Sequence, residues 1–139
     1  MFADGGHLGW RSGSQDIILK VDHLRTIHAM FALNWLTDFR GNFTRLRHQC
    51  SSLGADLFRA NIVSDPSCAC GCPLEDAIHY LLECPLYTNA RMQLIMSITP
   101  YTVISIENLL FGSDNLTDEN NLIVFRNVHK YIHHSNRFE

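Results

Sequence analysis

Residues 68–84 have the sequence CACGCPLEDAIHYLLEC, which places four of the five cysteines of the chain close to a histidine. The pattern is C-x-C-x8-H-x4-C, with Cys72 left over. Thiolates and a neutral imidazole are the ligands that Zn²⁺ prefers, and structural sites hold four of them in a tetrahedron. The stretch therefore predicts a zinc site within residues 66–86, formed by His79, Cys84 and two of the three clustered cysteines.

The spacing leaves the choice between the three clustered cysteines open. Cys68 and Cys70 fit the pattern, but Cys68 with Cys72, or Cys70 with Cys72, could supply the pair instead. A Cys68–Cys72 pair would close a more relaxed loop, because only one residue separates Cys68 from Cys70. Gly71 allows the backbone to turn sharply within this loop. Disulfide bonds are not expected, because thiols stay reduced inside cells.

The rest of the chain has the pattern of a mainly α-helical protein. Its 139 residues suffice for one domain, and apolar residues recur at helical spacings of three and four. We predict a disordered lead-in at 1–14, an N-terminal helix of unplaced origin within 15–41, and a small helical zinc-binding domain at 42–139. The predicted helices cover about 15–39, a segment from 42 onward, 55–61, 75–83, 86 or 88 to 97, 106–111 and 118–134.

Polar residues mark where several of these helices begin. Asn42 can cap the helix from 42 onward, because its side-chain oxygen can accept hydrogen bonds from free backbone amides. The predicted helices at 106–111 and 118–134 start at Ser105 and Thr117. In the helix at 55–61, Leu57 and Phe58 are expected to face the core. These boundaries divide the second half of the chain into short helices joined by turns.

Charge is unevenly distributed along the chain, whose formal net charge is −3. Residues 1–60 hold seven Lys or Arg against five Asp or Glu, and residues 61–139 hold four against nine. Arginine predominates among the basic residues, and its planar guanidinium group suits phosphate oxygens. The candidate nucleic-acid-binding residues are Arg40, Arg45, Arg47 and Arg59, with Arg91 nearby past the zinc site. The alternative is that the arginines form only a solvated helix face.

Several classes of protein are disfavoured by the same sequence. No apolar run approaches the roughly 20 residues that a membrane-spanning helix needs, so we expect no membrane partner. The N-terminal residues lack a basic segment followed by an apolar one, so we expect an intracellular protein, in the cytoplasm or the nucleus. No phosphate-loop, zinc-protease, serine-hydrolase or paired-carboxylate motif occurs, so we expect neither enzyme activity nor a small-molecule substrate.

Residues 68–91 resemble the Cys/His segment near the carboxyl end of non-LTR retrotransposon polyproteins of invertebrates. The shared pattern is two cysteines before a glycine, an acidic pair, H-x-L-x-x-C-P, an aromatic residue and Ala-Arg. In this chain the pattern falls on Cys68, Cys70-Gly71, Glu75-Asp76, His79, Leu81, Cys84-Pro85, Tyr87 and Ala90-Arg91. The block TRLRHQCS at residues 44–51 and the tail from Leu110 onward resemble the same polyproteins.

The resemblance implies a zinc-binding segment of the kind that follows a reverse transcriptase domain. Its cysteine before a glycine selects Cys70 over Cys72, so the implied ligands are Cys68, Cys70, His79 and Cys84. It also implies contact with RNA or an RNA/DNA hybrid by a chain that lacks the polymerase itself. The alternative is a structural or protein-interaction module, or an inactive remnant of an element, in which zinc only stabilises the fold. The net negative charge favours this alternative.

Overall fold

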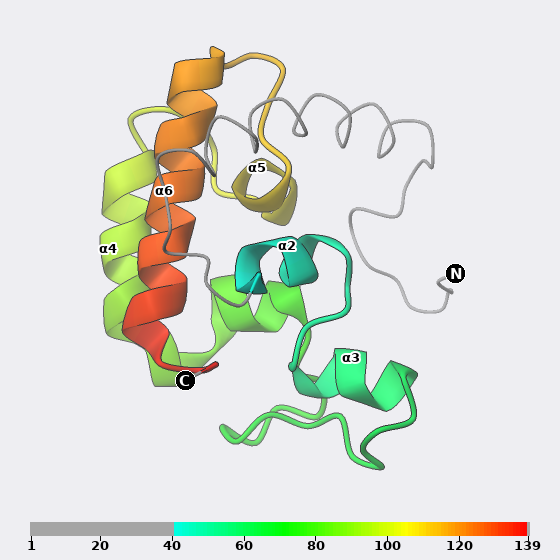
Figure 1. Cartoon of the computed structure of the whole chain (residues 1–139). Coiled ribbons are helices and arrows are strands. Elements are labelled where there is room, and N and C mark those ends of the chain that lie inside the picture. Colours follow the sequence, from blue (N-terminus) through cyan, green and yellow to red (C-terminus); the bar gives the residue numbers. More distant parts are fainter. Residues whose placement is uncertain (1–40, 139) are drawn as a thin grey trace.

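The computed structural model describes residues 41–138, so the predicted lead-in and the predicted helix at 15–39 lie outside the described residues. Within this range the chain is helical and contains no strand, which confirms the predicted fold class. The elements in Figure 1 are α2 (Asn42–Arg47), α3 (Gly54–Arg59), the π-helix η2 (His79–Glu83), the 3-10 helix η3 (Pro85–Tyr87), α4 (Thr88–Ile98), α5 (Ile106–Leu110) and α6 (Asp118–Ser135). None of these helices is long and apolar enough to cross a membrane.

Helices α4 and α6 lie side by side and run in opposite directions, and α5 packs against α6 (Figure 1). Helix α6 begins where the sequence predicts, because the Thr117 hydroxyl accepts a 3.1 Å hydrogen bond from the amide of Asn120. Ser105 caps α5 in the same way and accepts a 3.1 Å hydrogen bond from the amide of Asn108. Both predicted helix starts are confirmed.

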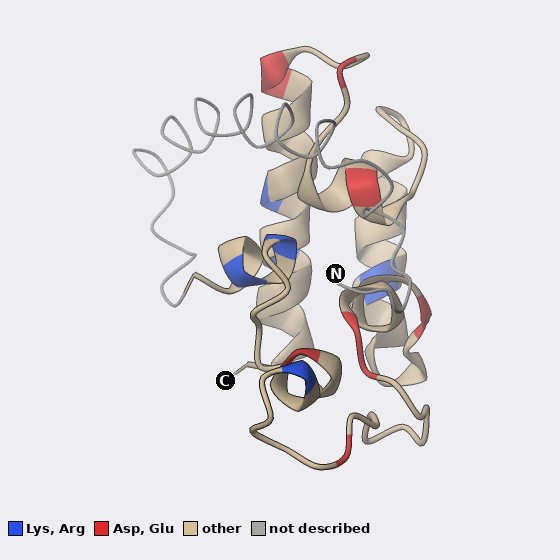
Figure 2. Cartoon of the chain, turned by 90° about the vertical axis from the view of Figure 1, so that its right-hand side faces the viewer, with Lys and Arg blue, Asp and Glu red and all other residues tan. Residues whose placement is uncertain are grey.

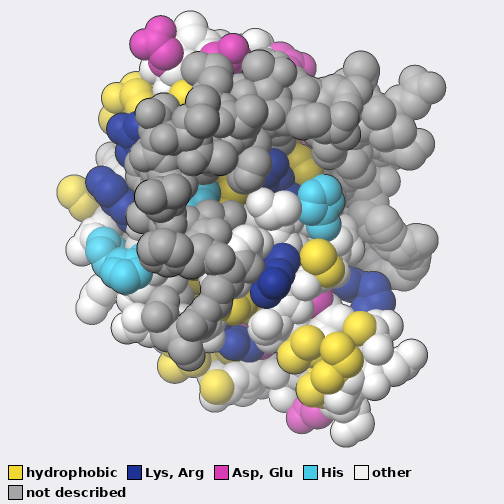
Figure 3. All heavy atoms as spheres, in the orientation of Figure 1, with side chains coloured by type: hydrophobic (Ala, Val, Ile, Leu, Met, Phe, Trp, Pro, Cys, Tyr) yellow, Lys and Arg dark blue, Asp and Glu magenta, His cyan; other side chains and the backbone are white. Residues whose placement is uncertain are grey.

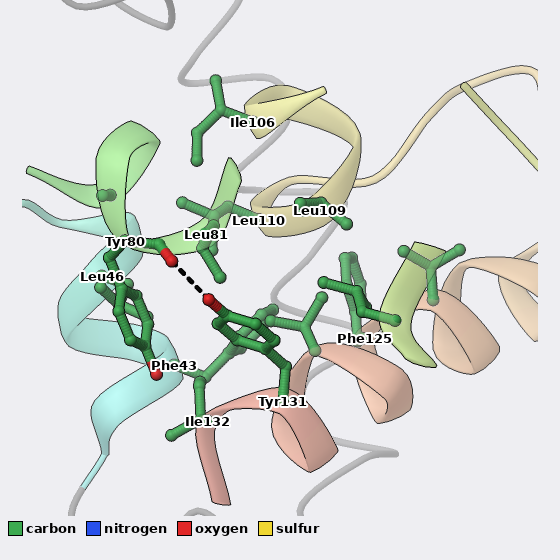
Figure 4. Close-up of a cluster of buried hydrophobic side chains, with 14 of the residues drawn as sticks. Phe43, Leu46, Tyr80, Leu81, Ile106, Leu109, Leu110, Phe125, Tyr131 and Ile132 are labelled. Carbon is green, nitrogen blue, oxygen red and sulfur yellow. Dashed lines mark hydrogen bonds between the residues drawn. The ribbon is translucent and has the colours of Figure 1, made fainter. Parts of the chain in front are cut away.

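The core lies where α2, the π-helix, α4, α5 and α6 meet (Figure 4). Phe43 of α2 packs against Phe125 of α6, with ring centroids 5.4 Å apart. Tyr80 and Tyr131 meet edge to face at 5.3 Å, and the Tyr131 hydroxyl donates a hydrogen bond to the Tyr80 carbonyl oxygen. Each fully buried ring contributes about 1.5–3 kcal/mol through burial. This cluster fastens the segment with the Cys/His pattern to the last helix.

Helix α2 begins differently from the prediction. Gly41, which precedes it, has a φ of 66°, a left-handed conformation that glycine adopts without strain. No side-chain oxygen caps the helix, so Asn42 is its first residue and not its cap. Phe43 and Leu46 are fully buried, and they hold this short helix in the core beside α6.

Helix α3 buries a different face from the predicted one. Phe58 is 48% exposed and Leu57 is only partly buried, whereas Ala55 and Asp56 are buried. The Asp56 carboxylate accepts hydrogen bonds from the amide and the hydroxyl of Ser51, at 3.0 and 2.6 Å. A buried carboxylate must keep its hydrogen bonds, because losing them costs more than exposing part of an apolar side chain. These bonds therefore set the orientation of α3.

Candidate metal centre

Glu75 fastens the base of the loop that carries three of the cysteines. Its amide donates a 2.8 Å hydrogen bond to the carbonyl of Pro66, and its carbonyl accepts a 2.9 Å bond from the amide of Ala55. The Glu75 carboxylate accepts a further bond from the Gly54 amide, at 2.8 Å. Both ends of the loop at 66–75 and the start of α3 therefore meet at one residue.

Two glycines allow this arrangement. A Cβ atom added to Gly54 would lie 2.6 Å from the carbonyl oxygen of Pro66 and 3.2 Å from that of Ser67. Because these are backbone atoms, which cannot swing aside, α3 approaches the loop this closely only with glycine at position 54. Within the loop, Gly71 has a φ of 104°, which confirms the predicted sharp turn.

A π-helical turn brings the other two candidate ligands to the same side. The amide of Cys84 donates a 2.8 Å hydrogen bond to the carbonyl of His79, five residues earlier. In a regular α-helix, with about 100° per residue, side chains five residues apart would diverge by about 140°. The wider turn instead brings the side chains of Cys84 and His79 to the same side of the segment. Pro85 follows, and its ring prevents the turn from continuing as a helix.

The loop and the π turn together gather four possible ligand atoms. The sulfur atoms of Cys68, Cys70 and Cys84 and a ring nitrogen of His79 all lie within 4.8 Å of one another. The Cys68 and Cys84 sulfurs are 3.7 Å apart, and the Cys70 sulfur is 3.3 Å from Nε2 of His79. A tetrahedron with Zn–S bonds of about 2.3 Å and a Zn–N bond of about 2.05 Å has edges of about 3.8 and 3.6 Å. The cluster therefore has the size of a four-coordinate metal site.

Cys72 lies outside this cluster. Its thiol is 3.5 Å from the carbonyl oxygen of Leu74. Within residues 41–138, the four side chains named above form the one group of His, Cys, Asp and Glu that could hold a metal ion. Three of them are buried, and Cys70 is half-buried. All five cysteines of the chain are free thiols.

The thiols of the cluster differ in acidity. Burial raises the pKa of Cys68 to about 12, although a backbone hydrogen bond from Cys70 acts in the opposite direction. A backbone hydrogen bond from Cys72 lowers the pKa of Cys70. Because a thiolate is the form that binds metal, a bound dication would favour deprotonation of both groups. The cluster can therefore take up a metal ion while it releases protons.

Carboxylates lie next to the histidine of the cluster. Asp76 accepts a 2.8 Å hydrogen bond from the His79 amide, which fixes the start of the π turn. Glu83 Oε1 lies 3.6 Å from Nδ1 of His79, whereas Nε2 faces Cys70. A histidine that binds metal through one ring nitrogen commonly presents the other to a carboxylate. The Nε2 atom of His79 is therefore the one placed for metal binding.

Arg137 is a neighbour of the cluster that sequence reasoning missed. Its Nε and Nη2 atoms donate to the two carboxylate oxygens of Glu75, both at 2.8 Å, and Nη2 also donates to the Ser52 carbonyl at 3.1 Å. Glu75 Oε2 lies 3.9 Å from the Cys68 sulfur. Burial raises the pKa of Glu75, but the bonds from Arg137 and the Gly54 amide outweigh it, and the net pKa is lowered. The sequence holds no local signal for this contact, which spans 62 positions.

Arg91 supports the backbone of residues 80–84, which follow the candidate ligand His79 and end at the candidate ligand Cys84. Its Nε donates to the Leu81 carbonyl at 3.1 Å, and its Nη2 donates to the Cys84 carbonyl at 2.6 Å and to the Tyr131 hydroxyl at 3.2 Å. The end of a helix leaves carbonyl groups without internal partners, and a buried arginine supplies donors to them. The interpretation of Arg91 as a phosphate contact is therefore wrong, because the residue is only 9% exposed.

The four arginines predicted to bind nucleic acid have different surroundings. Arg40 lies outside the described residues, and Arg45 on α2 is exposed. The guanidinium carbon of Arg47 lies 4.4 Å from the centroid of a phenylalanine ring on its own helix. Arg59 forms a 2.8 Å ion pair with an aspartate of its own helix. Of the three described arginines, Arg45 therefore has the clearest access to a phosphate group.

The surface of the described part is mixed in character. Figure 2 shows lysine and arginine on several helices, with aspartate and glutamate interspersed among them. Figure 3 shows apolar side chains gathered at the lower right of the view, over α3. Phe58 and Ile62, which are 48% and 68% exposed, belong to this region of the chain. The basic residues are thus spread over several elements.

Comparison with known proteins relates one segment of the chain to a mobile element. No protein-family model matches the chain, and no solved structure matches it. The chain is similar to the Retrovirus-related Pol polyprotein from type-1 retrotransposable element R1 3 of Nasonia vitripennis, with 45% identity over 40 residues. The matched segment covers 29% of this chain and 10% of the polyprotein. The retrotransposon resemblance is thus supported for that segment alone.

Proposed function

We propose that this chain is a zinc-binding helical module derived from a non-LTR retrotransposon polyprotein. One Zn²⁺ per chain is held by Cys68, Cys70, His79 and Cys84. The observation that carries this proposal is the clustering of these four ligand atoms within 4.8 Å of one another. Four protein ligands complete a tetrahedron and leave no coordination position for a substrate, so the metal is structural. It joins the cysteine loop to the π-helical turn.

Zinc is favoured over other metals by the ligand set. Three thiolates exclude the hard cations Mg²⁺ and Ca²⁺, which bind oxygen ligands. Metal analysis of the purified, reduced chain tests the proposal, with one equivalent of zinc expected. Substitution by Co²⁺ should give the absorption of a tetrahedral site with three sulfur ligands and one nitrogen. A zinc content well below one equivalent in reduced protein would overturn the proposal.

A second candidate function is contact with RNA or an RNA/DNA hybrid, and the exposure of Arg45 on α2 favours it. An arginine that binds phosphate releases counterions, so the affinity falls as the salt concentration rises. Binding of the chain to single-stranded RNA, measured over a range of salt concentrations, tests this function. If the chain does not bind RNA even at low salt, only the structural role of the module remains.

We propose no polymerase or nuclease activity for this chain. The two catalytic metals of polymerases require a set of free carboxylates in one site. Among the described residues, the buried carboxylates of Glu75 and Asp56 are each paired with an arginine. Template-dependent incorporation of nucleotides by this chain alone would contradict the proposal.

A further inference from the structure

We propose that Arg137 is a positioning residue for the metal centre and acts through Glu75, an inference that rests on the proposed zinc function. The contacts form a continuous path from Arg137 to the Glu75 carboxylate and from there to the sulfur of Cys68. The path joins the end of the described chain to a loop 62 positions earlier. It therefore links the turn after α6 to the metal centre.

The geometry of the contact between Arg137 and Glu75 fixes the orientation of the Glu75 carboxylate. Arg137 binds both oxygens of Glu75 at 2.8 Å, and the Glu75 side chain is only 5% exposed. A two-pronged contact between arginine and a carboxylate fixes the carboxylate in orientation as well as in position. The same carboxylate accepts a hydrogen bond from the Gly54 amide. The Glu75 amide donates to the Pro66 carbonyl and so closes the loop. Arg137 thus holds the base on which the loop with Cys68 is built.

Charge gives a second reason for an arginine at this position. A zinc ion with three thiolates and one imidazole has a net charge of −1, and Glu75 Oε2 lies 3.9 Å from the Cys68 sulfur. An uncompensated carboxylate there would oppose the thiolate that the metal requires. Arg137 supplies the compensating positive charge. Loss of Arg137 would leave a buried, unpaired carboxylate beside the metal centre, which is costly.

The coupling must act in both directions. If Arg137 strengthens metal binding by some factor, then bound metal strengthens the contact of Arg137 with Glu75 by the same factor. The turn after α6 should therefore be held more firmly in the zinc-bound chain than in the zinc-free chain. If Arg137 supported only the general stability of the fold, zinc would protect its contact no more than it protects the start of α6.

The test compares metal affinity in four proteins, by competition with a chromophoric chelator. These are the parent chain, Arg137→Ala, Arg137→Lys and the control Lys130→Ala, which removes one exposed positive charge from α6. We expect Arg137→Ala to bind zinc at least about tenfold more weakly, as is typical when an outer partner of a metal ligand is lost. The zinc affinity of Arg137→Lys should lie between those of Arg137→Ala and the parent, because lysine keeps the positive charge but cannot donate to both carboxylate oxygens in the same geometry. Lys130→Ala should match the parent.

Hydrogen exchange in the unmodified chain gives a measurement that does not depend on a variant folding. Saturating zinc should slow exchange of the Gly54 amide and of the Arg137 Nε–H by about tenfold, the same factor by which Arg137 is expected to strengthen zinc binding. The Asn120 amide, at the start of α6, should change much less.

The outcomes separate the two proposals. If the parent binds no zinc, the proposed function fails and this inference fails with it. If the parent binds zinc but Arg137→Ala binds it as tightly as Lys130→Ala, this inference alone is overturned. The same holds if zinc leaves both exchange rates, at Gly54 and Arg137, unchanged.

Discussion

The guanidinium of Arg91 donates a 2.6 Å hydrogen bond to the carbonyl oxygen of Cys84, the candidate ligand that follows the π-helical turn. The same group donates to the carbonyls of Tyr80 and Leu81 and to the hydroxyl of Tyr131. One side chain of α4 therefore satisfies three carbonyls of residues 80–84 and connects that segment to α6.

We expect Arg91→Ala to lower the free energy of unfolding by about 1–3 kcal/mol, the cost of one buried carbonyl that loses its partner. That carbonyl belongs to Leu81, because the Tyr80 carbonyl keeps the Tyr131 hydroxyl and the Cys84 carbonyl keeps the Tyr87 amide. Arg91→Lys should recover only part of this loss, because one ammonium group cannot donate to all the separated acceptors that the guanidinium group reaches. Urea unfolding measures the change.

Arg45→Ala is the matched control for this prediction, because Arg45 is exposed and its loss should change the free energy of unfolding by less than about 0.5 kcal/mol. If the Arg91→Ala and Arg45→Ala variants are equally stable, the carbonyls around Arg91 have found other partners, and the supporting role of Arg91 is refuted.

Much of the fold follows from local signals in the sequence. Helix α6 carries a regular apolar stripe, of which Phe125 and Val128 are buried, and it begins after Thr117 as predicted. The start of α5 at Ser105 likewise follows from neighbouring residues in the sequence. The spacing of the cysteines and His79 also predicts a metal site in this segment, although it leaves the choice between Cys70 and Cys72 open and only the retrotransposon resemblance selects Cys70. Patterns of this kind are visible because neighbouring residues decide them.

Other features depend on hydrogen bonds of side chains and of irregular backbone, which the apolar pattern of the sequence does not reveal. Helix α3 is too short for the spacing of its apolar residues to show which face is buried. The hydrogen bonds between Asp56 and Ser51 orient it so that Phe58 is exposed, contrary to the prediction that it faces the core. Arg91 resembles a surface basic residue until the free carbonyls of the π turn are known. The π turn itself has no distinctive composition, since its i to i+5 bond arises from packing and from Pro85.

Cys70→Ser should reduce the affinity for zinc by more than about 100-fold, which exceeds the loss typical of an outer-shell change. Cys72→Ser should leave the affinity unchanged. The Cys70 sulfur is 3.3 Å from Nε2 of His79, whereas the Cys72 thiol lies beside the Leu74 carbonyl, outside the cluster. Zinc retention against a competing chelator distinguishes the two variants. The reverse result would assign Cys72 as the ligand and Cys70 as the spare thiol.

Removal of zinc with a chelator should loosen residues 66–86 and leave the pairing of α4 and α6 largely intact. Structural zinc contributes directly to the folding free energy of the segment that it closes. The pairing of α4 and α6 rests on buried apolar residues outside 66–86, which include Leu94 and Val128. Amide hydrogen exchange with and without chelator measures the effect at each position. Equal loss of protection in α6 would show instead that the whole domain unfolds as one unit.

Gly54→Ala should destabilise the chain by about 1–3 kcal/mol, the cost typical of overpacking, and should weaken zinc binding as well. The added methyl group would lie 2.6 Å from the Pro66 carbonyl oxygen, so α3 and the cysteine loop would have to separate. Ser52→Ala, at an exposed position two residues earlier, is the control and should change neither quantity. Urea unfolding and chelator competition report the two effects. Unchanged zinc affinity in Gly54→Ala would show that the loop binds metal without its contact to α3.

The arginines of α2 offer a test of nucleic-acid contact. Replacing Arg45 and Arg47 with alanine should weaken RNA binding and flatten its dependence on salt. The slope of log K against log salt concentration should fall by about 0.7–0.9 for each phosphate contact removed. Arg45→Ala alone is the cleaner variant, because Arg47 also packs over Phe43 and its loss changes stability.

Lys130→Ala removes an exposed positive charge from α6 and serves as the control for this series. A contact specific to α2 requires Arg45→Ala to reduce the affinity and the salt slope more than Lys130→Ala does. If the variants of α2 bind RNA like the parent, these arginines form only a solvated helix face. The candidate metal site then remains as the part of the proposed function with structural support, since none of its four ligands lies on α2.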